Sequence, residues 1–530
     1  VKLNKAGVND KMLDSKYLIK LENNREVKRI LSDYYTPRLG RVFKAEEKKY
    51  FYDTGTGKIA EITDEVYKIL KTVLENGKIQ DLNKLNLTDE QLEEGFLDIF
   101  KAIKEENVLS ANPVVKLTGE GVYNLEYSLS NNLTSLLLEV TEKCNLRCKY
   151  CIYNPNHPEF RDFGHRDMNI DIAIKAVNML FENSNDTNED ICIGFYGGEP
   201  LLNKKLIKEI VEYSKVKSIE YDKNVIFAMT CNGTLMDIDT AQYIVENNFN
   251  IIFSIDGPEE IHNENRIFAN GKGSFQSAIQ GVKNYQYVKE KSGKEMENPL
   301  VFNMVVDGQD ILGKYTKIQN FIDSNEWLPE NLQILITAID LGPEESEYIL
   351  PMSIEEREIT KNKIDPSLYW LRKQNTNRKE KTIIDQSLYK GLERIHKRLC
   401  IDKPVTHYGM NGCCVPGKQR MYVTVDGEIY PCEKTGNIPS LGNVEKGFDI
   451  NKIKRFYIKD FINESSKYCK NCWAINLCGL CYTNCFDSNS IHYSYRHKSC
   501  IEERIYLSNL LSEYCACLEN FPDIIKNLED

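Results

Sequence analysis

The stretch SLLLEVTEKCNLRCKYC, residues 135–151, joins an apolar run to a loop that carries Cys144, Cys148 and Cys151. The run SLLLEV has the length and the apolar character of a buried β-strand. Three cysteines so close together in an intracellular chain indicate metal binding rather than disulfides. Taken alone, the loop fits two metals equally: a zinc ion with His157 as the fourth ligand, or an iron–sulfur cube with one iron free of cysteine.

Five further apolar runs follow, and helical stretches separate most of them. They are ICIGFY (191–196), VIFAMT (225–230), IIFSI (251–255), LVFNMVV (300–306) and LQILIT (332–337). Alternation of helices with near-continuous apolar strands predicts an α/β fold with a parallel sheet. We predict that the six strands curl into a partial (β/α)6 barrel. The chemistry of such barrels takes place in the loops after the carboxyl ends of the strands.

Three of these loops carry residues suited to a small polar ligand. They are YGGEP (196–200), TCNGT (230–234) and SIDGP (254–258). Paired glycines allow the backbone to approach a ligand closely, and a glutamate can bind an ammonium group. The candidate ligand-binding residues are Gly197, Gly198, Glu199, Asn232, Ser254 and Asp256.

The motifs CxxxCxxC, GGEP and SxDG after the first, second and fourth strands resemble those of radical S-adenosylmethionine (radical SAM) enzymes. The resemblance spans roughly residues 133–340. It implies that Cys144, Cys148 and Cys151 hold a 4Fe–4S cluster, with Tyr150 as the aromatic residue beside the last cysteine. It also implies that the cluster passes an electron to SAM, which releases methionine and a 5′-deoxyadenosyl radical that abstracts hydrogen from a substrate.

The same resemblance assigns the binding of SAM to the other loops. Glu199 and the Gly197–Gly198 backbone would hold the amino group of the methionine part, while Ser254 and Asp256 would reach other parts of the cofactor. Asn232 matches the asparagine of the TNG stretch of the family. Cys231 stands here where the family has the threonine.

A second group of cysteines lies in the C-terminal part, where nine of the seventeen cysteines fall between Cys413 and Cys500. Their pattern resembles the SPASM extension, which holds two auxiliary 4Fe–4S clusters, so three clusters are expected in all. By position, the ligands of the distal cluster are Cys469, Cys472, Cys478 and Cys500. The ligands of the nearer cluster are Cys414 and Cys432, with Cys481 or Cys485 as a third.

Two departures from the SPASM pattern leave this assignment open. Only two residues separate Cys478 from Cys481, where the family has three, and Cys485 follows as an extra candidate. Cys413 adjoins Cys414, so either could be the ligand. Paired zinc sites are the alternative, because thiolate tetrads bind zinc as well as iron–sulfur clusters.

The N-terminal part has a layout of its own. KKYFYDTGTGKIAEI (48–62) predicts a β-hairpin around Gly55 and Gly57, and a helix is expected to begin near Thr63 or Asp64. A second helix is expected to open with the capping box TDEQ (88–91). This winged-helix-like plan resembles the peptide-recognition domains of ribosomal-peptide maturases, which bind a leader peptide as an added strand. A purely structural cap on the barrel is the alternative.

The chain of 530 residues is therefore divided into four parts. We predict an N-terminal leader-peptide recognition domain over 1–118 with its core at about 40–112, a radical SAM barrel over 130–342, bridging helices over 343–405 and a SPASM domain over 406–530. The net charge of −11 argues against nucleic acid as a partner. The absence of a signal segment or a long apolar run predicts a cytoplasmic protein that does not associate with membranes.

Together these features predict a peptide maturase that links a cysteine sulfur to a carbon atom, resembling thioether-forming sactipeptide and ranthipeptide enzymes. Its partners would be a cysteine-rich precursor peptide with a leader segment and an electron donor such as flavodoxin or ferredoxin. An anaerobic sulfatase-maturing enzyme, which forms formylglycine, is an alternative because SIDGP…IHNENR…GKGSF resembles that subgroup. Carbon–carbon or ether crosslinking and a non-catalytic metal-bound scaffold are further alternatives.

Overall fold

The computed structural model describes residues 37–76, 79–113, 117–157, 160–186, 190–293, 298–306, 310–338, 383–410, 412–487, 489–526 and 528. Most of the predicted bridging segment, up to residue 382, lies outside the described residues, as do residues 1–36 of the predicted N-terminal domain. Within the described part, no helix is both long and apolar enough to cross a bilayer.

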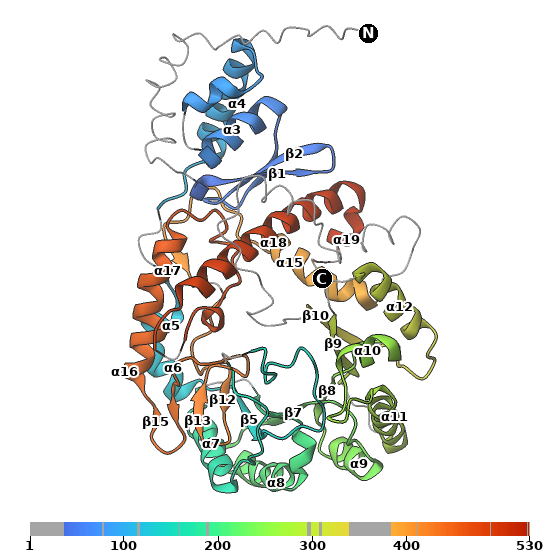
Figure 1. Ribbon diagram of the computed structural model, residues 1–530. Coiled ribbons are helices and arrows are strands. Elements are labelled where there is room, and N and C mark those ends of the chain that lie inside the picture. The colour runs from blue at the N-terminus through green and yellow to red at the C-terminus, as the bar shows by residue number, and fades with distance from the viewer. Residues whose placement is uncertain are drawn as a thin grey trace.

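Six parallel strands follow one another in the order of the sequence and confirm the six predicted apolar runs. They are β5 (Ser135–Thr141), β6 (Ile191–Gly197), β7 (Val225–Cys231), β8 (Asn250–Phe253), β9 (Val301–Val306) and β10 (Gln333–Ala338). The connecting helices are α7 (Ile170–Glu182), α8 (Lys204–Tyr221), α9 (Ile238–Glu246), α10 (Glu259–Asn265), α11 (Phe275–Ser292) and α12 (Ile311–Asp323). The strands form a curved sheet with the helices on its outer side (Figure 1). The fold is thus α/β with a mostly parallel central sheet.

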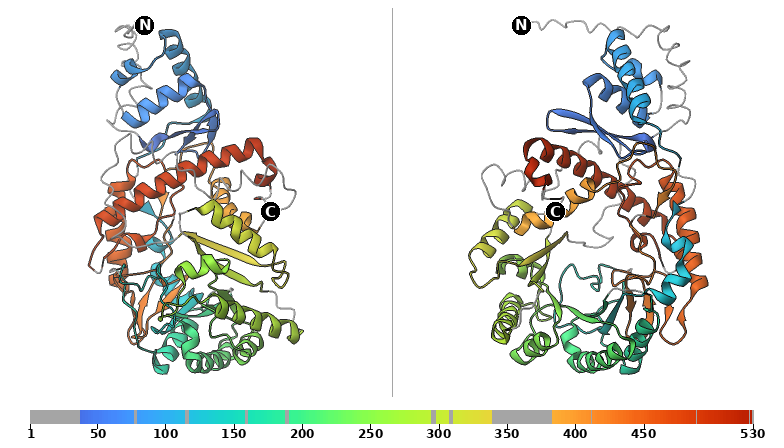
Figure 2. Two further views of the ribbon diagram at one scale, coloured as in Figure 1. Left: turned by 45° about the vertical axis from the view of Figure 1, so that its right-hand side comes forward. Right: turned by 180° about the vertical axis from the view of Figure 1, so that it is seen from behind.

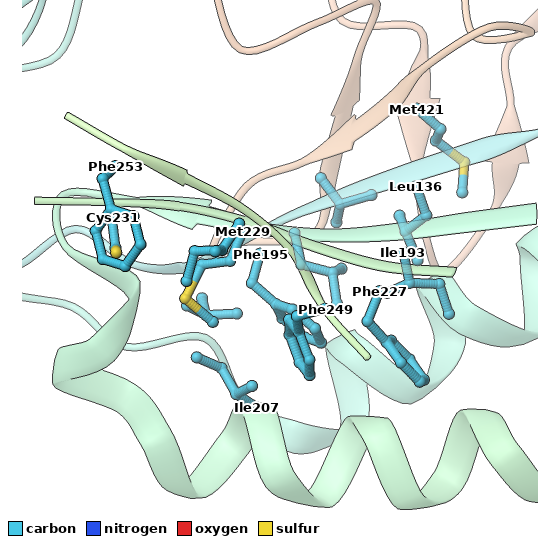
Figure 3. Packing of buried hydrophobic residues seen from close by; sticks show 14 of the residues in the cluster. Leu136, Ile193, Phe195, Ile207, Phe227, Met229, Cys231, Phe249, Phe253 and Met421 are labelled. Carbon is cyan, nitrogen blue, oxygen red and sulfur yellow. The ribbon is translucent and has the colours of Figure 1, made fainter. Parts of the chain in front are cut away.

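The core lies between this sheet and its helices. Side chains alternate along each strand, so that Ile193 and Phe195 of β6 point toward the helices. Figure 3 shows these two side chains and those of Phe227 and Met229 on the side of the sheet that faces Ile207 of α8. The opposite face of the sheet carries the intervening residues, which are less buried in β7 and β9, whereas Glu139 and Thr141 of β5 are buried as well.

The sheet continues past β5 into the cysteine-rich part of the chain. Strand β12 (Met421–Val423) pairs in parallel with β5, and three antiparallel strands follow. These are β13 (Glu428–Tyr430), β14 (Gly442–Asn443) and β15 (Gly447–Phe448). The extension covers the edge of β5, which would otherwise expose unpaired backbone groups. Sequence analysis did not predict it, because strands of two or three residues carry almost no periodic pattern.

The N-terminal part has a three-stranded antiparallel sheet with two helices. The strands are β1 (Gly40–Ala45), β2 (Lys48–Asp53) and β3 (Ile59–Glu61), in the order β1-β2-β3. The helices are α3 (Asp64–Asn76) and α4 (Asp89–Glu106). The predicted helix start at Asp64 is confirmed, and so is the capping box, because the backbone N–H of Gln91 donates to Thr88 Oγ1 at 3.3 Å and the N–H of Thr88 to Gln91 Oε1 at 3.0 Å.

This sheet is packed on both faces. Val42 and Phe51 face α3 and α4, whereas Phe43 and Tyr52 join a second core with helix α18 (Tyr493–Asn520) and α15 (Ile383–His396). Figure 2 shows β1 and β2 lying along α18 in both views. The turn after β2 also contacts the segment between Cys472 and Cys478, since Thr54 Oγ1 donates to the carbonyl oxygen of Trp473 at 2.8 Å.

Candidate active site and cysteine clusters

The loop that carries the first three cysteines is fixed at its root by the end of β6. The N–H of Gly198 donates to Thr141 O at 2.9 Å, and the N–H of Glu199 donates to Lys143 O at 2.8 Å. Gly197 has φ +141°, and a Cβ on Gly198 would lie 2.3 Å from Lys143 O. Both glycines are therefore needed so that two backbone segments can approach each other just before Cys144.

The other side of the loop is paired with the segment that follows β8. The N–H of Arg147 donates to Ile267 O at 2.7 Å, and the N–H of Lys149 donates to Asn265 O at 3.1 Å. A third bond runs from the N–H of Ala269 to a loop carbonyl, so the two segments form a short antiparallel ribbon. Sequence analysis quoted IHNENR only for its resemblance to one subgroup and missed this role, because pairing between distant irregular segments leaves no local pattern.

The three loop thiols lie near one another beside a buried cation. Burial and the neighbouring Glu199, Cys148 and Cys151 raise the pKa of the Cys144 thiol to about 12. Burial likewise raises the pKa of Cys148 to about 12, while the guanidinium of Arg266 opposes the shift. Burial thus keeps the free thiols protonated, and a bound metal centre would supply the positive charge that holds them as thiolates.

Arg266 belongs to an ion pair directly behind the loop. Asp256 is 0% exposed, and its Oδ2 lies 3.0 Å from Arg266 Nε. Tyr150 Oη donates to the same oxygen at 2.6 Å, and the N–H of Val305 donates to Oδ1 at 2.9 Å. Both carboxylate oxygens are thus engaged within the protein, so Asp256 lies where it supports Cys148 and Tyr150. Its predicted contact with SAM stays a prediction.

The side chain of His262 is hydrogen-bonded to the backbone at Asp256. Burial, together with Arg266, lowers the pKa of His262 to about 3, so the imidazole is neutral. Its Nδ1 accepts from the N–H of Asp256 at 3.4 Å, which places the proton on Nε2, 3.0 Å from Ser274 Oγ. Ser274 then donates to Arg266 O at 2.9 Å, which completes a chain of bonds from Asp256 back to the arginine.

Glu199 occupies the other wall of the site. It is 1% exposed and accepts the N–H of Asn232 at 2.8 Å and that of Leu201 at 3.1 Å. Burial raises its pKa to about 7, although these two N–H groups act in the opposite direction. The side chain of Asn232 donates to Asn145 Oδ1 in the cysteine loop at 2.9 Å. The structure therefore brings the predicted Glu199 and Asn232 together with the cysteine loop, and Ser254 bonds through its N–H to Cys231 O.

Five of the C-terminal cysteines line one pocket. Burial raises the pKa of the Cys469 thiol to about 12, with Arg496 opposing and Cys472 and Cys500 adding to the shift. A pocket lined by several thiols and a buried arginine fits an anionic thiolate-ligated cluster. The cysteines that line this pocket are Cys413, Cys469, Cys472, Cys478 and Cys500.

The remaining C-terminal cysteines gather around Cys481. Burial raises the pKa of the Cys432 thiol to about 12, and Cys481 contributes to that shift as it does to those of Cys413 and Cys414. Cys485 is 0% exposed and lies 3.3 Å from the carbonyl oxygen of Cys481, between this set and the distal one. Cys481 lies close to both Cys413 and Cys414, and Cys485 also contributes to the pKa shift of Cys413, so the choice between Cys481 and Cys485 as a ligand of the nearer cluster stays a prediction.

Among the described residues, no three His, Cys, Asp or Glu side chains converge closely enough to coordinate one metal ion.

Comparison with known proteins agrees with this geometry. Residues 138–289 match the family described as the Radical SAM superfamily. Over 155 residues the chain is 34% identical to a cysteine-type anaerobic sulfatase-maturating enzyme of Clostridium novyi, a match that covers 29% of this chain and 40% of that relative. A longer match, 22% identical over 483 residues, covers 87% of this chain and 90% of the radical SAM cyclopropyl synthase TigE of Paramaledivibacter caminithermalis.

Among solved structures, native anSMEcpe with bound AdoMet has a TM-score of 0.50 at 22% identity, over 74% of this chain and 100% of that one. This likeness shows the fold. Residues 138–289 thus form a radical SAM domain, and the chain is similar to anaerobic sulfatase-maturating enzymes and to a radical SAM cyclopropyl synthase. Members of this superfamily use 4Fe–4S clusters and S-adenosylmethionine.

Proposed function

We propose that Cys144, Cys148 and Cys151 hold a 4Fe–4S cluster and that this protein is a peptide maturase. When bound, the cluster and SAM supply one-electron chemistry that yields a 5′-deoxyadenosyl radical. The observation that carries this proposal is that the three loop thiols lie near one another at one end of the sheet, beside the buried Arg266 and the buried Glu199.

The residues of this chain would divide the work of binding. Glu199 would attract the ammonium group of SAM, because a buried carboxylate with a raised pKa gains strongly from a cation. Asn232 links Glu199 to the cysteine loop and would hold the two at a fixed separation. Arg266 would offset the negative charge that the thiolates bring to a buried place.

A peptide substrate is supported by the N-terminal sheet. Strand β3 is at the edge of this sheet, with β2 as its only partner among the described strands. Ile62 N–H bonds to Lys49 O and Asp53 N–H to Lys58 O, so residues 58, 60 and 62 face β2. The N–H of Glu61 therefore points away from the sheet, where an extended peptide could add a strand.

We expect that the substitution Glu61→Pro will weaken binding of the precursor peptide about tenfold, because it removes one outward N–H without touching the bonds to β2. Glu61→Ala is the matched control, since it also loses the exposed ion pair with Lys48 but keeps the N–H. Fluorescence anisotropy of a labelled peptide would measure both. Equal affinities for the two variants would rule out strand addition at this edge.

Deletion of the whole N-terminal part is a poorer test. It would expose the face of α18 that packs against Phe43 and Tyr52, and it would remove the bond from Thr54 to Trp473. A point substitution leaves this interface in place.

For the product, we propose a thioether between a cysteine sulfur and a carbon of the precursor. Formation of formylglycine is the second candidate, favoured by the match to the sulfatase-maturating enzyme of Clostridium novyi. Formation of a carbon–carbon bond is a third, favoured by the match to TigE over most of the chain. The three products differ in mass and in the number of free thiols.

The test is anaerobic coexpression with a short cysteine-containing peptide encoded beside the enzyme, followed by measurement of the intact mass. Loss of two hydrogens per crosslink, with the same number of cysteines becoming unreactive to alkylation, would establish the thioether. Loss of two hydrogens with every thiol still reactive would identify a carbon–carbon or ether bond. Conversion of a cysteine to an aldehyde would identify formylglycine, and either result would overturn the thioether proposal.

A further inference from the structure

Arg496 of α18 lies between the two sets of C-terminal cysteines. Its side chain is buried, with the residue 4% exposed. Nη1 lies 3.4 Å from Cys485 Sγ, and Nη2 lies 3.7 Å from Cys469 Sγ. The guanidinium carbon is 5.5 Å from the centre of the Phe461 ring, so an aromatic face covers one side of the group. A single cation thus contacts a sulfur of the distal set and the sulfur that lies next to the nearer set.

The charge of this arginine requires an anionic partner. Within the described residues, no carboxylate pairs with Arg496, and its Nε is buried without a hydrogen-bond partner. An uncompensated buried charge costs several kcal/mol. The atoms that the structure places against its two Nη groups are the sulfurs of Cys485 and Cys469. Sulfur anions are therefore the partners that this site offers.

We propose that Arg496 is a positioning residue shared by the two auxiliary clusters, and that it raises the reduction potential of the distal one. The inference rests on the proposed function, because it requires that both cysteine sets hold clusters. A cluster with thiolate ligands becomes more negative when it is reduced. Hydrogen bonds to its sulfurs and a nearby positive charge stabilise that reduced state.

The test uses the full chain with Cys144, Cys148 and Cys151 replaced by alanine, so that only auxiliary clusters are observed. Arg496→Gln removes the charge and Arg496→Lys keeps it while losing the second donor group. Lys498→Gln is the matched control, because this lysine lies on the same helix with its side chain 40% exposed. Each protein is reconstituted anaerobically, its iron is counted, and its clusters are titrated with reductant while the electron paramagnetic resonance spectrum is followed.

We expect that Arg496→Gln will keep its iron and that the midpoint potential of one cluster will shift to more negative values. Arg496→Lys should give a smaller shift and Lys498→Gln none. Unchanged potentials in Arg496→Gln would overturn the inference, and so would equal loss of iron from both arginine variants, which indicates a purely structural role. If the parent protein itself holds no iron in the C-terminal cysteines, the proposed auxiliary clusters are wrong. If the parent holds iron and Arg496→Gln leaves the potentials unchanged, only the role of Arg496 is wrong.

Discussion

Replacing Gly198 by alanine is expected to lower the rate of SAM cleavage about a hundredfold, the size of loss that a displacement of about 1 Å can cause. The new Cβ would lie 2.3 Å from Lys143 O and 2.7 Å from Glu142 O. Both atoms belong to the backbone, so relief requires movement of the segment that leads into Cys144. The measurement is the formation of 5′-deoxyadenosine by the reconstituted protein.

The matched control for this substitution is Gly119→Ala, because a Cβ at Gly119 would meet nothing within 4 Å. This variant should cleave SAM at the rate of the unaltered protein. Unimpaired cleavage by Gly198→Ala would show that the cysteine loop does not depend on its close contact with the end of β6.

Replacing Arg266 by glutamine is expected to destabilise the protein by about 3 kcal/mol or more and to abolish SAM cleavage. The substitution leaves Asp256 fully buried without its cation and removes the positive charge beside Cys148. Urea unfolding measures the loss of stability, and iron content shows whether the cluster is retained. Formation of 5′-deoxyadenosine measures the cleavage of SAM.

Two further variants separate stability from chemistry. The double variant Arg266→Gln with Asp256→Asn has no buried charge at this position, so it should regain stability while cleavage stays lost. Lys272→Gln, an exposed position in the same connection, should change neither quantity. If the double variant cleaves SAM normally, the charge of Arg266 has no part in the chemistry.

The strands and their order could be predicted because each carries a strong local signal. The run at 191–196 is apolar over its whole length and the run at 300–306 is apolar except for Asn303, which is expected when helices cover one face of a parallel sheet and the other lines a barrel. The helix start at Asp89 was equally local, since its capping box is contained within four residues. At Asp64 the signal is Thr63, whose Oγ1 accepts from the N–H of Val66.

The parts that sequence analysis missed all depend on distant residues meeting. Strand β12 extends the sheet across nearly three hundred residues of chain, and no property of Met421–Val423 by itself indicates this. The ribbon between the cysteine loop and residues 265–269 is irregular in both segments. The cation that pairs with Asp256 comes from position 266, ten residues later, where spacing alone gives no indication.

The contact between the N-terminal sheet and α18 was missed for a similar reason. The alternation of Val42 and Phe43 shows that both faces of β1 are apolar, which predicts burial on both sides. It does not identify the second partner. That partner is the helix that also carries Cys500 and Arg496, so the proposed peptide-binding sheet and the distal cysteine set are parts of one packed unit.

The most direct test of the central claim is the measurement of 5′-deoxyadenosine by liquid chromatography after anaerobic reconstitution with iron and sulfide and reduction with dithionite. We predict that the unaltered protein forms 5′-deoxyadenosine from SAM and that Cys148→Ala, while retaining the iron of its C-terminal cysteines, forms none. A fully iron-loaded protein that leaves SAM intact, or a Cys148→Ala variant that cleaves it equally well, would contradict the assignment of the cysteine loop as the active site.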